Sequence, residues 1–246
     1  MKAITTLILV SFTLAFSPGD FLAEQKKYQR VRTALNEKGK LIADKLKEKN
    51  ITVGELNILI VAYKAESELN VYGKSKTGSA FELLSTYRIC SASGEPGPKR
   101  RQGDGQVPEG FYTIDRFNPA SSFYLSLGVS YPNQSDRKKS KFRNPGGDIF
   151  IHGSCVTIGC MPMTDDKIKE IYLYAVYAKQ NGQINIPVYI FPFKMTESNF
   201  SDYTKRHKDD PELVSFWTNL KQGFDRFEAN KNQLKYSVDN AGNYTY

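Results

Sequence analysis

The spacing of apolar residues divides the chain into three stretches. Residues 25–50 place apolar side chains three or four positions apart among many charges, which predicts an amphipathic helix. Residues 51–193 contain short apolar or alternating runs, as expected of β-strands. Residues 211–232 return to helical spacing with an aromatic-rich face. The pattern therefore predicts a mainly β domain with flanking helices, an α+β fold.

Seven segments of the middle stretch are candidate strands. They are residues 57–63, 68–72, 81–90, 110–116, 123–128, 148–152 and 187–191. The first two are close enough to form a hairpin. A loop dense in glycine and proline follows the third, at residues 91–109, and one helix is predicted at residues 165–181.

The first residues have the pattern of a secretory signal peptide. Lys2 supplies a positive start, residues 3–16 are largely apolar, and small or turn-forming residues follow. We place the cleavage after Ala23, because Pro18 directly after Ser17 disfavours an earlier cut. The segment is too short to span a bilayer comfortably. The expected protein is therefore periplasmic or otherwise exported, and soluble without a stable membrane anchor.

The remaining length suits one domain with appendages. The expected parts are a signal peptide at 1–23, an N-terminal helix at 24–50, a main domain at 51–193 and a C-terminal helical extension at 194–246. The formal net charge of +8 favours anionic partners such as a cell-wall polymer or a membrane surface. Nucleic acid is disfavoured, because an exported chain without a recognition motif has no means to select it.

The chain has three cysteines, too few for a disulfide-built scaffold. An odd number in an exported chain leaves at least one thiol free, and we assign it to Cys160. A disulfide between Cys90 and Cys155 would account for the other two, whereas the alternative bridge between Cys155 and Cys160 would silence the thiol. The absence of a Cys-x-x-Cys pair argues against a thiol-disulfide oxidoreductase.

The densest chemistry lies in residues 151–160, Ile-His-Gly-Ser-Cys-Val-Thr-Ile-Gly-Cys. His152 precedes Cys160 by eight positions, whereas the only other histidine, His207, lies in a charged run. An imidazole can take the proton of a thiol and so activate it as a nucleophile. Gly159 lets the backbone approach a substrate carbonyl, and the Cys160 amide would then be an oxyanion donor. The segment predicts cysteine catalysis with His152 as the base.

Other interpretations of the segment stay open. No acidic residue is identifiable to orient the imidazole, although a backbone carbonyl could do so. His152 would otherwise be a buried histidine beside a disulfide. A metal site of His152, Cys155 and Cys160 lacks a fourth ligand, so we expect neither metal nor cofactor. The hydroxyls of Ser154 and Thr157 would surround the thiolate or bond the loop backbone.

Several separated motifs resemble the L,D-transpeptidase catalytic domain (YkuD-like) family. His152-Gly153 followed by Thr157-Ile158-Gly159-Cys160 resembles the family's His-Gly and Ser/Thr-x-Gly-Cys signature, and residues 107–112 resemble its Pro-x-Gly-x-Tyr element. Further segments resemble the murein branch of the YafK or DpaA type. They are Cys90, residues 94–100, Tyr131-Pro132-Asn133, Asp136-Arg137 and residues 153–160. The resemblance covers roughly residues 51–193.

The resemblance implies a β-rich, sandwich-like fold acting on the stem peptides of peptidoglycan, in cell-wall biogenesis and cell shape. Cys160 would attack the carbonyl on the L-centre of meso-diaminopimelate to give a thioester. His152 would take the thiol proton and later protonate the leaving amine. An amine acceptor would make the protein a transpeptidase. Water would make it a carboxypeptidase or an amidase, including one that releases a wall-linked lipoprotein.

The chain departs from the family after the cysteine. Met161-Pro162-Met163 stands where the family often has an arginine that contacts a substrate carboxylate. The replacement would come from a set of basic residues that are equally ordinary surface charges. They are Lys99, Arg100, Arg101, Arg137, Lys141 and Arg143. The short interval between His152 and Cys160 predicts an open site, suited to bulky substrates or to hydrolysis.

Two residues are expected in the substrate cleft by resemblance alone. Tyr131 and Asn133 would line it, although they also fit an ordinary Pro-Asn turn. The aromatic face around Trp217 is expected to be core rather than a sugar platform. A non-catalytic wall-binding module is the rival interpretation. The presence of both His152 and Cys160 argues against it, because adhesion needs neither.

Overall fold

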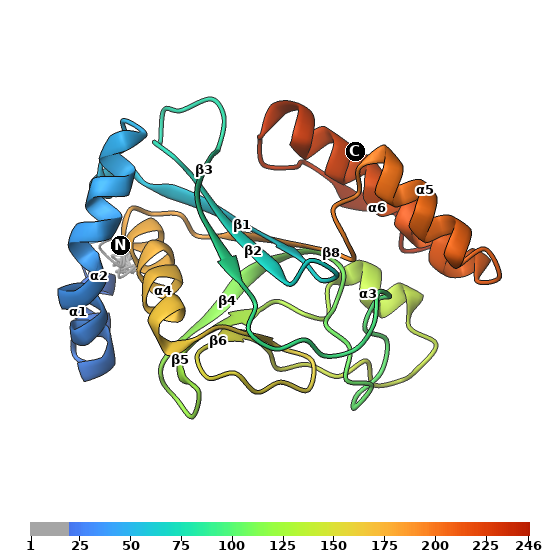
Figure 1. The fold of residues 1–246 in the computed structure, drawn as a ribbon, viewed down its shortest axis with the longest axis horizontal. Coiled ribbons are helices and arrows are strands. Elements are labelled where there is room, and N and C mark those ends of the chain that lie inside the picture. Colours follow the sequence, from blue (N-terminus) through green and yellow to red (C-terminus); the bar gives the residue numbers. More distant parts are fainter. Residues whose placement is uncertain (1–19) are drawn as a thin grey trace, which may run out of the picture.

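Helices cover both faces of one curled β-sheet in the computed structural model, which describes residues 20–246 (Figure 1). The helices are α1 (Asp20–Lys26), α2 (Gln29–Glu48), α3 (Gln134–Lys139), α4 (Asp165–Gln180), α5 (Glu197–Arg206) and α6 (Pro211–Asn230), with a short 3-10 helix at Val53–Glu55. The strands of the large sheet are β1 (Asn57–Tyr63), β2 (Glu68–Lys74), β3 (Glu82–Arg88), β4 (Gly110–Ser121), β5 (Tyr124–Val129), β6 (Ile149–His152), β7 (Met161–Pro162) and β8 (Pro187–Phe191). A separate small sheet joins β9 (Ser237–Val238) and β10 (Tyr244–Thr245).

The large sheet has the strand order β3-β2-β1-β8-β4-β5-β6-β7. Its neighbours are antiparallel except for β1 with β8 and β6 with β7. The long strand β4 changes partner along its length. Residues 110–113 pair with β8, and residues 114–121 pair with β5. The sheet curls at this change of partner, and the α+β prediction is confirmed.

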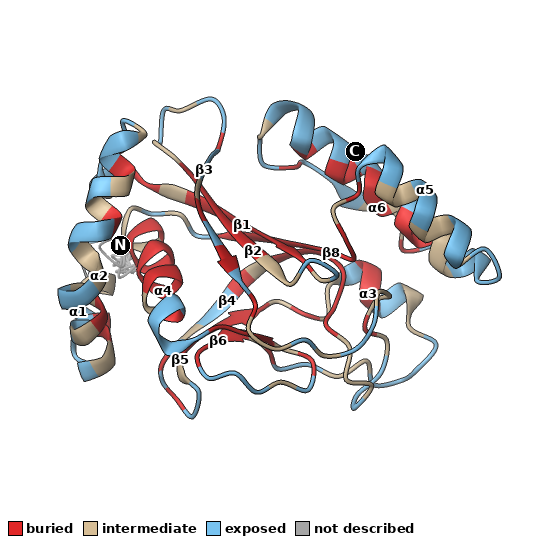
Figure 2. Cartoon of the chain, viewed as in Figure 1, coloured by how far each residue is buried: buried red, intermediate tan, exposed pale blue. Residues whose placement is uncertain are grey.

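Strand β1 shows how the sheet separates two cores. Side chains alternate between the faces of a strand. Ile58 and Ile60 therefore join an aliphatic cluster with α2 and α4, and Leu59 and Val61 join an aromatic cluster with α6. Buried residues follow the strands and the inner faces of these helices (Figure 2). Because β1 is buried on both faces, its sequence is a continuous apolar run.

The helices begin at recognisable caps. The Thr164 side chain accepts a hydrogen bond from the Lys167 amide at the start of α4. Asp210 caps α6 in the same way and is followed by Pro211, which suits the first helical turn. Most strands and helices are thus where the sequence predicts them, and the predicted helix at 24–50 is divided into α1 and α2. Helix α3 and the short strands β7, β9 and β10 are not predicted, and α5 lies within the predicted helical extension at 194–246, where only the helix at 211–232 is placed.

The signal-peptide prediction falls mainly on residues 1–19, which lie outside the described residues. The end of the predicted peptide belongs to α1, where the Phe21 ring packs edge-on against Phe117 with centroids 5.0 Å apart. The Leu22 amide donates to Gln180 Oε1 at 2.8 Å. A cut after Ala23 would therefore remove these two contacts with the domain. Within residues 20–246, no helix combines the length and apolar character that crossing a membrane requires.

Candidate active site

The candidate nucleophile and base belong to two neighbouring strands. Strand β6 ends at His152, and β7 begins directly after Cys160. The two strands pair in parallel, with His152 opposite Pro162. The loop of residues 153–160 connects them and places both candidate residues at the same edge of the sheet.

Close contacts fix the course of this loop at its two glycines. A Cβ atom on Gly153 would lie 2.6 Å from Asp165 Oδ1, nearer than any real side chain allows. Gly159 has a φ of +129°, and a Cβ atom there would lie 3.1 Å from the Gln106 carbonyl oxygen. The Ser154 amide donates to Asp165 Oδ1 at 2.9 Å. Both glycines are therefore required by the backbone geometry of the loop.

A disulfide between Cys90 and Cys155 ties the loop to the chain just beyond β3. Cys160 is the free cysteine, as the sequence analysis assigns. The alternative bridge between Cys155 and Cys160 is therefore wrong. A metal site that includes Cys155 is wrong for the same reason, because a disulfide sulfur offers no thiolate. In the part of the chain that the structure describes, no group of three or more side chains is placed to hold a metal ion.

The backbone around Cys160 is held by the hydroxyl of Thr157. This hydroxyl accepts from the Cys160 amide at 2.8 Å and donates to the Cys160 carbonyl oxygen at 2.8 Å. It also accepts from the Gly159 amide at 3.2 Å. The Thr157 hydroxyl thus bonds the loop backbone, which is one of the two uses that the sequence leaves open for it. The Cys160 amide must leave this hydroxyl before it can serve as an oxyanion donor.

The Cys160 thiol is partly buried and protonated at neutral pH. Burial raises its pKa above the ordinary value of 9.0, and the charge of Asp148 raises it further. A backbone hydrogen bond from Phe150 and the charge of Lys99 act in the opposite direction. The sulfur lies 3.6 Å from the carbonyl oxygen of Asp148, to which the thiol donates.

The His152 ring is buried, with 2% of the residue exposed, and packs against Phe123 at 4.7 Å between centroids. Burial lowers the imidazole pKa below 6.5, although a hydrogen bond to the Gly153 backbone opposes this. Nδ1 lies 2.6 Å from the Gly153 carbonyl oxygen. A carbonyl only accepts, so Nδ1 carries the hydrogen and Nε2 keeps a free lone pair. The backbone carbonyl thus supplies the orienting contact for which the sequence offers no carboxylate.

No hydrogen bond joins Cys160 to His152 among the contacts of residues 20–246. The strand register explains why the two side chains are not hydrogen-bonded, because His152 pairs with Pro162, which lies two positions beyond Cys160. Catalytic hydrogen bonds often form only when substrate is bound. A proton transfer between the two residues requires the sulfur to turn away from Asp148.

Cys160 lines a cavity of about 530 Å³, named here the Cys160 cavity. Its other walls are the end of β1 with Lys64, the loop after β3, and a segment of the C-terminal extension. That segment contributes Tyr203, Arg206 and His207. His152 does not line this cavity. The sequence predicts a helical extension at 194–246 but not that its residues line the cavity of Cys160.

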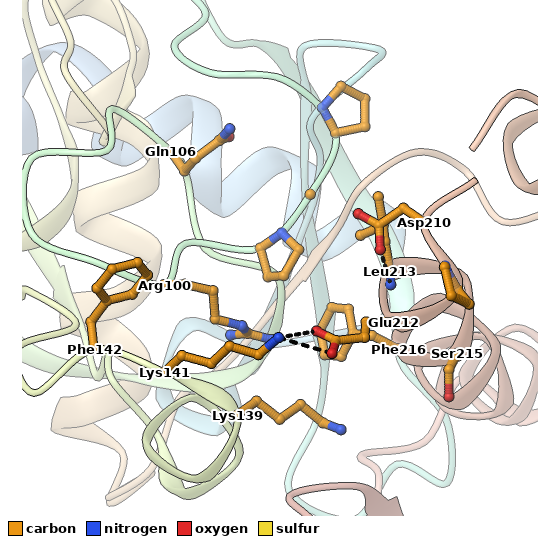
Figure 3. A pocket seen from close by; sticks show the side chains of 14 residues that line it. Arg100, Gln106, Lys139, Lys141, Phe142, Asp210, Glu212, Leu213, Ser215 and Phe216 are labelled. Carbon is orange, nitrogen blue, oxygen red and sulfur yellow. Dashed lines mark hydrogen bonds and ion pairs between the residues drawn. The ribbon is translucent and has the colours of Figure 1, made fainter. Parts of the chain in front are cut away.

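A second cavity, named here the Arg100 cavity, lies next to the first and has a volume of about 740 Å³. The two share Pro96 in their walls. Figure 3 shows Lys141 pointing at Glu212 across the Arg100 cavity, and two contacts of 2.8 Å join them. The same view places Arg100 beside Phe216.

Tyr131 and Asn133, expected in the cleft, form structural hydrogen bonds instead. The Tyr131 hydroxyl donates to the Pro145 carbonyl oxygen at 3.0 Å. Asn133 caps α3 and donates to Tyr244 Oη at 2.9 Å. Neither residue lines the Cys160 cavity. Contact of either with substrate stays a prediction.

The basic residues predicted to hold a carboxylate lie outside the Cys160 cavity as well. Lys99 is buried and pairs with Asp104 at 2.6 Å. Arg100 pairs with Asp136 at 2.8 Å. The others are largely exposed on the surface. They are Arg101, Arg137, Lys141 and Arg143.

Comparison with known proteins identifies the family of the chain. The family described as YkuD, the L,D-transpeptidase catalytic domain, matches residues 57–190. The chain therefore belongs to the L,D-transpeptidase (YkuD) family, as its motifs predict. It is similar to the YafK protein of Escherichia coli (strain K12), provisionally described as an L,D-transpeptidase. The two are 40% identical over 185 residues, which cover 74% of this chain and 71% of YafK.

Two solved structures are similar to part of this chain. The helical cell shape determining protein Pgp2 from Campylobacter jejuni is 19% identical, with a TM-score of 0.44 over 74% of this chain and 73% of that one. Bd1075 from Bdellovibrio bacteriovorus is 23% identical, with a TM-score of 0.41 over 68% of this chain and 58% of that one.

Proposed function

We propose that this protein is a cysteine-dependent peptidoglycan enzyme with Cys160 as nucleophile and His152 as general base. One observation carries the proposal. The free thiol of Cys160 opens onto a cavity, and an oriented, neutral imidazole ends the adjacent strand. Membership of the L,D-transpeptidase family supplies the substrate class, the stem peptides of the cell wall.

In the proposed reaction, substrate binding turns the thiol from Asp148 towards His152. The sulfur attacks the carbonyl on the L-centre of meso-diaminopimelate while Nε2 takes the thiol proton. Because the pKa of the thiol is raised and that of the imidazole is lowered, proton transfer accompanies attack rather than preceding it. The scissile bond then breaks, the amine leaves with the proton from His152, and a thioester remains.

The acceptor decides the outcome. We favour an amine, which makes the protein an L,D-transpeptidase. Water would give carboxypeptidase or amidase activity, including release of a wall-linked lipoprotein. The Cys90–Cys155 disulfide supports the proposal that the protein works outside the cytoplasm, because disulfides persist in oxidising compartments.

Mass spectrometry of muropeptides tests the proposal. Tetrapeptide and protein-linked forms are incubated with the wild type and with Cys160→Ala, with and without a D-amino acid acceptor. Exchanged or cross-linked products that vanish in the variant support a transpeptidase, and shortened or released stems alone support a hydrolase. Ile158→Ala is a matched control, because this side chain is 91% exposed on the same loop. Its activity should stay within about twofold, as for an ordinary surface substitution.

A wall-binding module is the competing outcome. It would leave every muropeptide unchanged, and Cys160→Ala would bind isolated cell walls as well as the wild type does. Sedimentation of both proteins with cell walls measures this binding.

A further inference from the structure

One wall of the Cys160 cavity comes from the C-terminal extension, and the others come from the family domain, residues 57–190. Tyr203 and Arg206 belong to α5, and His207 follows it directly. These residues lie beyond residue 190, where the family match ends. Their role in the cavity is therefore a property of this chain that family membership does not assign.

The guanidinium of Arg206 lies over an aromatic stack. Its guanidinium carbon lies 4.1 Å from the centroid of the Tyr203 ring. Tyr203 in turn stacks on the fully buried Phe193, with centroids 3.9 Å apart and planes 7° from parallel. A guanidinium that lies on an aromatic face keeps its N–H edge free for a planar, two-bonded acceptor. The stack thus orients the charge before any ligand arrives.

The stack is anchored to the core through Trp217. The His207 ring meets Trp217 edge-on at 5.1 Å, and Trp217 is fully buried. The indole Nε1 donates to Glu109 Oε2 at 3.0 Å, and Glu109 is itself fully buried. The end of α5 is therefore fixed against the family domain, and Arg206 keeps its place in the cavity.

Arg206 is also the cation of this cavity that lacks an acidic partner within residues 20–246. Lys64 lines the same cavity, but its ammonium is used by Glu109 at 2.8 Å and by two carbonyl oxygens. Glu95 is the acid in the lining, and no ion pair joins it to Arg206. The hydrogen bond of Arg206 to the protein runs from Nε to the Asp202 carbonyl oxygen at 3.3 Å.

We propose that Arg206 binds a carboxylate of the peptide whose carbonyl reaches Cys160. The inference rests on the proposed function, because a stem peptide presents free carboxylates at its C-terminus and at the D-centre of diaminopimelate. Arg206 is then a specificity residue that acts through binding. It takes no part in the covalent step.

The first test needs no enzymatic activity. Cys160 is alkylated with iodoacetate, which is an anion, and with neutral iodoacetamide, and the ratio of the two rates is measured at low salt. Arg206→Gln should lower this ratio about threefold, because a nearby cation concentrates anions. Lys205→Gln removes the same charge from the same helix but lies outside the cavity, so its ratio should stay within about 1.5-fold of wild type. An unchanged ratio in Arg206→Gln overturns the proposal.

The second test uses the muropeptide tetrapeptide and its two amidated forms, one at the C-terminus and one at the D-centre of diaminopimelate. Arg206→Gln should raise KM roughly tenfold with kcat changed less than about threefold, as expected for loss of one charged hydrogen-bonded pair. With wild type, one of the two amidated substrates should show the same rise in KM, and Arg206→Gln should not raise its KM further. If wild type and Arg206→Gln have equal KM values for the unmodified tetrapeptide, the proposal is overturned.

The two tests fail separately. If wild type converts no muropeptide, the proposed function is wrong, but the alkylation ratio still decides whether Arg206 attracts anions to Cys160. Arg206→Lys extends the measurement. It keeps the charge and should retain the alkylation ratio, yet it should not restore KM, because an ammonium cannot form the planar pair.

Discussion

The Cys160 cavity and the Arg100 cavity share a wall but differ in how their charges are used. In the Arg100 cavity, Arg100 pairs with Asp136 and Lys141 pairs with Glu212. In the Cys160 cavity, Arg206 has no acidic partner among the described residues. Lys139 also lines the Arg100 cavity, but its ammonium donates to the neutral Asn243 Oδ1 at 2.7 Å and has no acidic partner among the described residues. The larger cavity thus holds two paired cations and one unpaired cation away from any nucleophile, and the smaller one holds the thiol. Unpaired charge beside a nucleophile identifies the candidate site better than cavity size or the number of cations.

The wall between the cavities is built around Glu109. This fully buried carboxylate accepts from Lys64 on the Cys160 side at 2.8 Å and from the Gly97 amide on the Arg100 side at 2.6 Å. Trp217 donates to its other oxygen at 3.0 Å. Because all these groups are paired, the wall is rigid. The two cavities therefore differ in the residues that line them and not in the rigidity of the wall that they share.

The largest expected effect comes from His152→Gln, which should lower the rate of thioester formation by about 10²–10⁴-fold. Loss of the imidazole leaves a thiol whose raised pKa keeps it protonated. Since burial lowers the His152 pKa below 6.5, wild-type activity should persist at pH 6.5 and decrease only at more acidic pH, where the imidazole is protonated. Single-turnover mass spectrometry from pH 5 to 9 measures this.

The chain's other histidine provides the matched control. His207→Gln should keep the acidic limb of the pH profile, because His207 is not the base. His152→Gln should lose that limb, and its rate should increase with pH as thiolate forms without help. A His152→Gln profile that parallels wild type would show that another group takes the proton.

The second effect is on the free energy of unfolding and concerns the wall that the two cavities share. Glu109→Gln should lower the free energy of unfolding by about 3 kcal/mol, because it leaves the buried Lys64 ammonium without its counter-charge. Trp217→Phe removes one hydrogen bond and should cost about 1–2 kcal/mol. Urea denaturation of the two variants measures the difference. A loss below about 1 kcal/mol for Glu109→Gln would mean that water reaches Lys64, and the shared wall would not be rigid.

The third effect concerns the rim of the Cys160 cavity alone. Replacing Cys90 and Cys155 together by alanine should lower the free energy of unfolding by about 2–4 kcal/mol, because the bridge closes a long loop. Ile89 and Ser91 flank Cys90 and line the Cys160 cavity, so alkylation of Cys160 should change as well. Wild type in a reducing agent is the matched control and should reproduce both changes. Unaltered stability in both experiments would show that the bridge does not constrain the unfolded chain.

Sequence reasoning predicts one side of the site and misses the other. His152, Gly159 and Cys160 belong to one short segment, so their spacing alone indicates the chemistry. The wall that α5 forms depends on contacts between segments distant in the sequence, such as the hydrogen bond of Trp217 to Glu109, which no local pattern encodes. Helix α5 also buries none of its residues fully, so it lacks the apolar stripe that reveals a helix such as α6.

The same contrast holds for the fold and the cysteines. Strand β1 is predicted from its short continuous apolar run, and helix α6 from apolar residues that repeat with helical spacing. The partner of Cys155 was left open, because pairing depends on Cα separation, which is 5.6 Å for Cys90 and Cys155. Asn133 belongs to a motif that resembles the family's, and its side chain caps α3 and does not line the Cys160 cavity.

The smallest effect is expected in the Arg100 cavity. Lys141 and Glu212 are joined by two contacts of 2.8 Å, but their side chains are 74% and 75% exposed. Exposed pairs of this kind contribute about 0.2–1 kcal/mol, so Lys141→Gln should change the free energy of unfolding by less than about 1 kcal/mol. Muropeptide turnover should change by less than about twofold, because the charge is already neutralised. A tenfold rise in the KM of Lys141→Gln, with no change in the ratio of iodoacetate to iodoacetamide alkylation rates at Cys160, would contradict this comparison of the two cavities. It would mean that substrate displaces Glu212, that the acidic part of the peptide lies in the larger cavity, and that a paired cation can still serve as a binding residue.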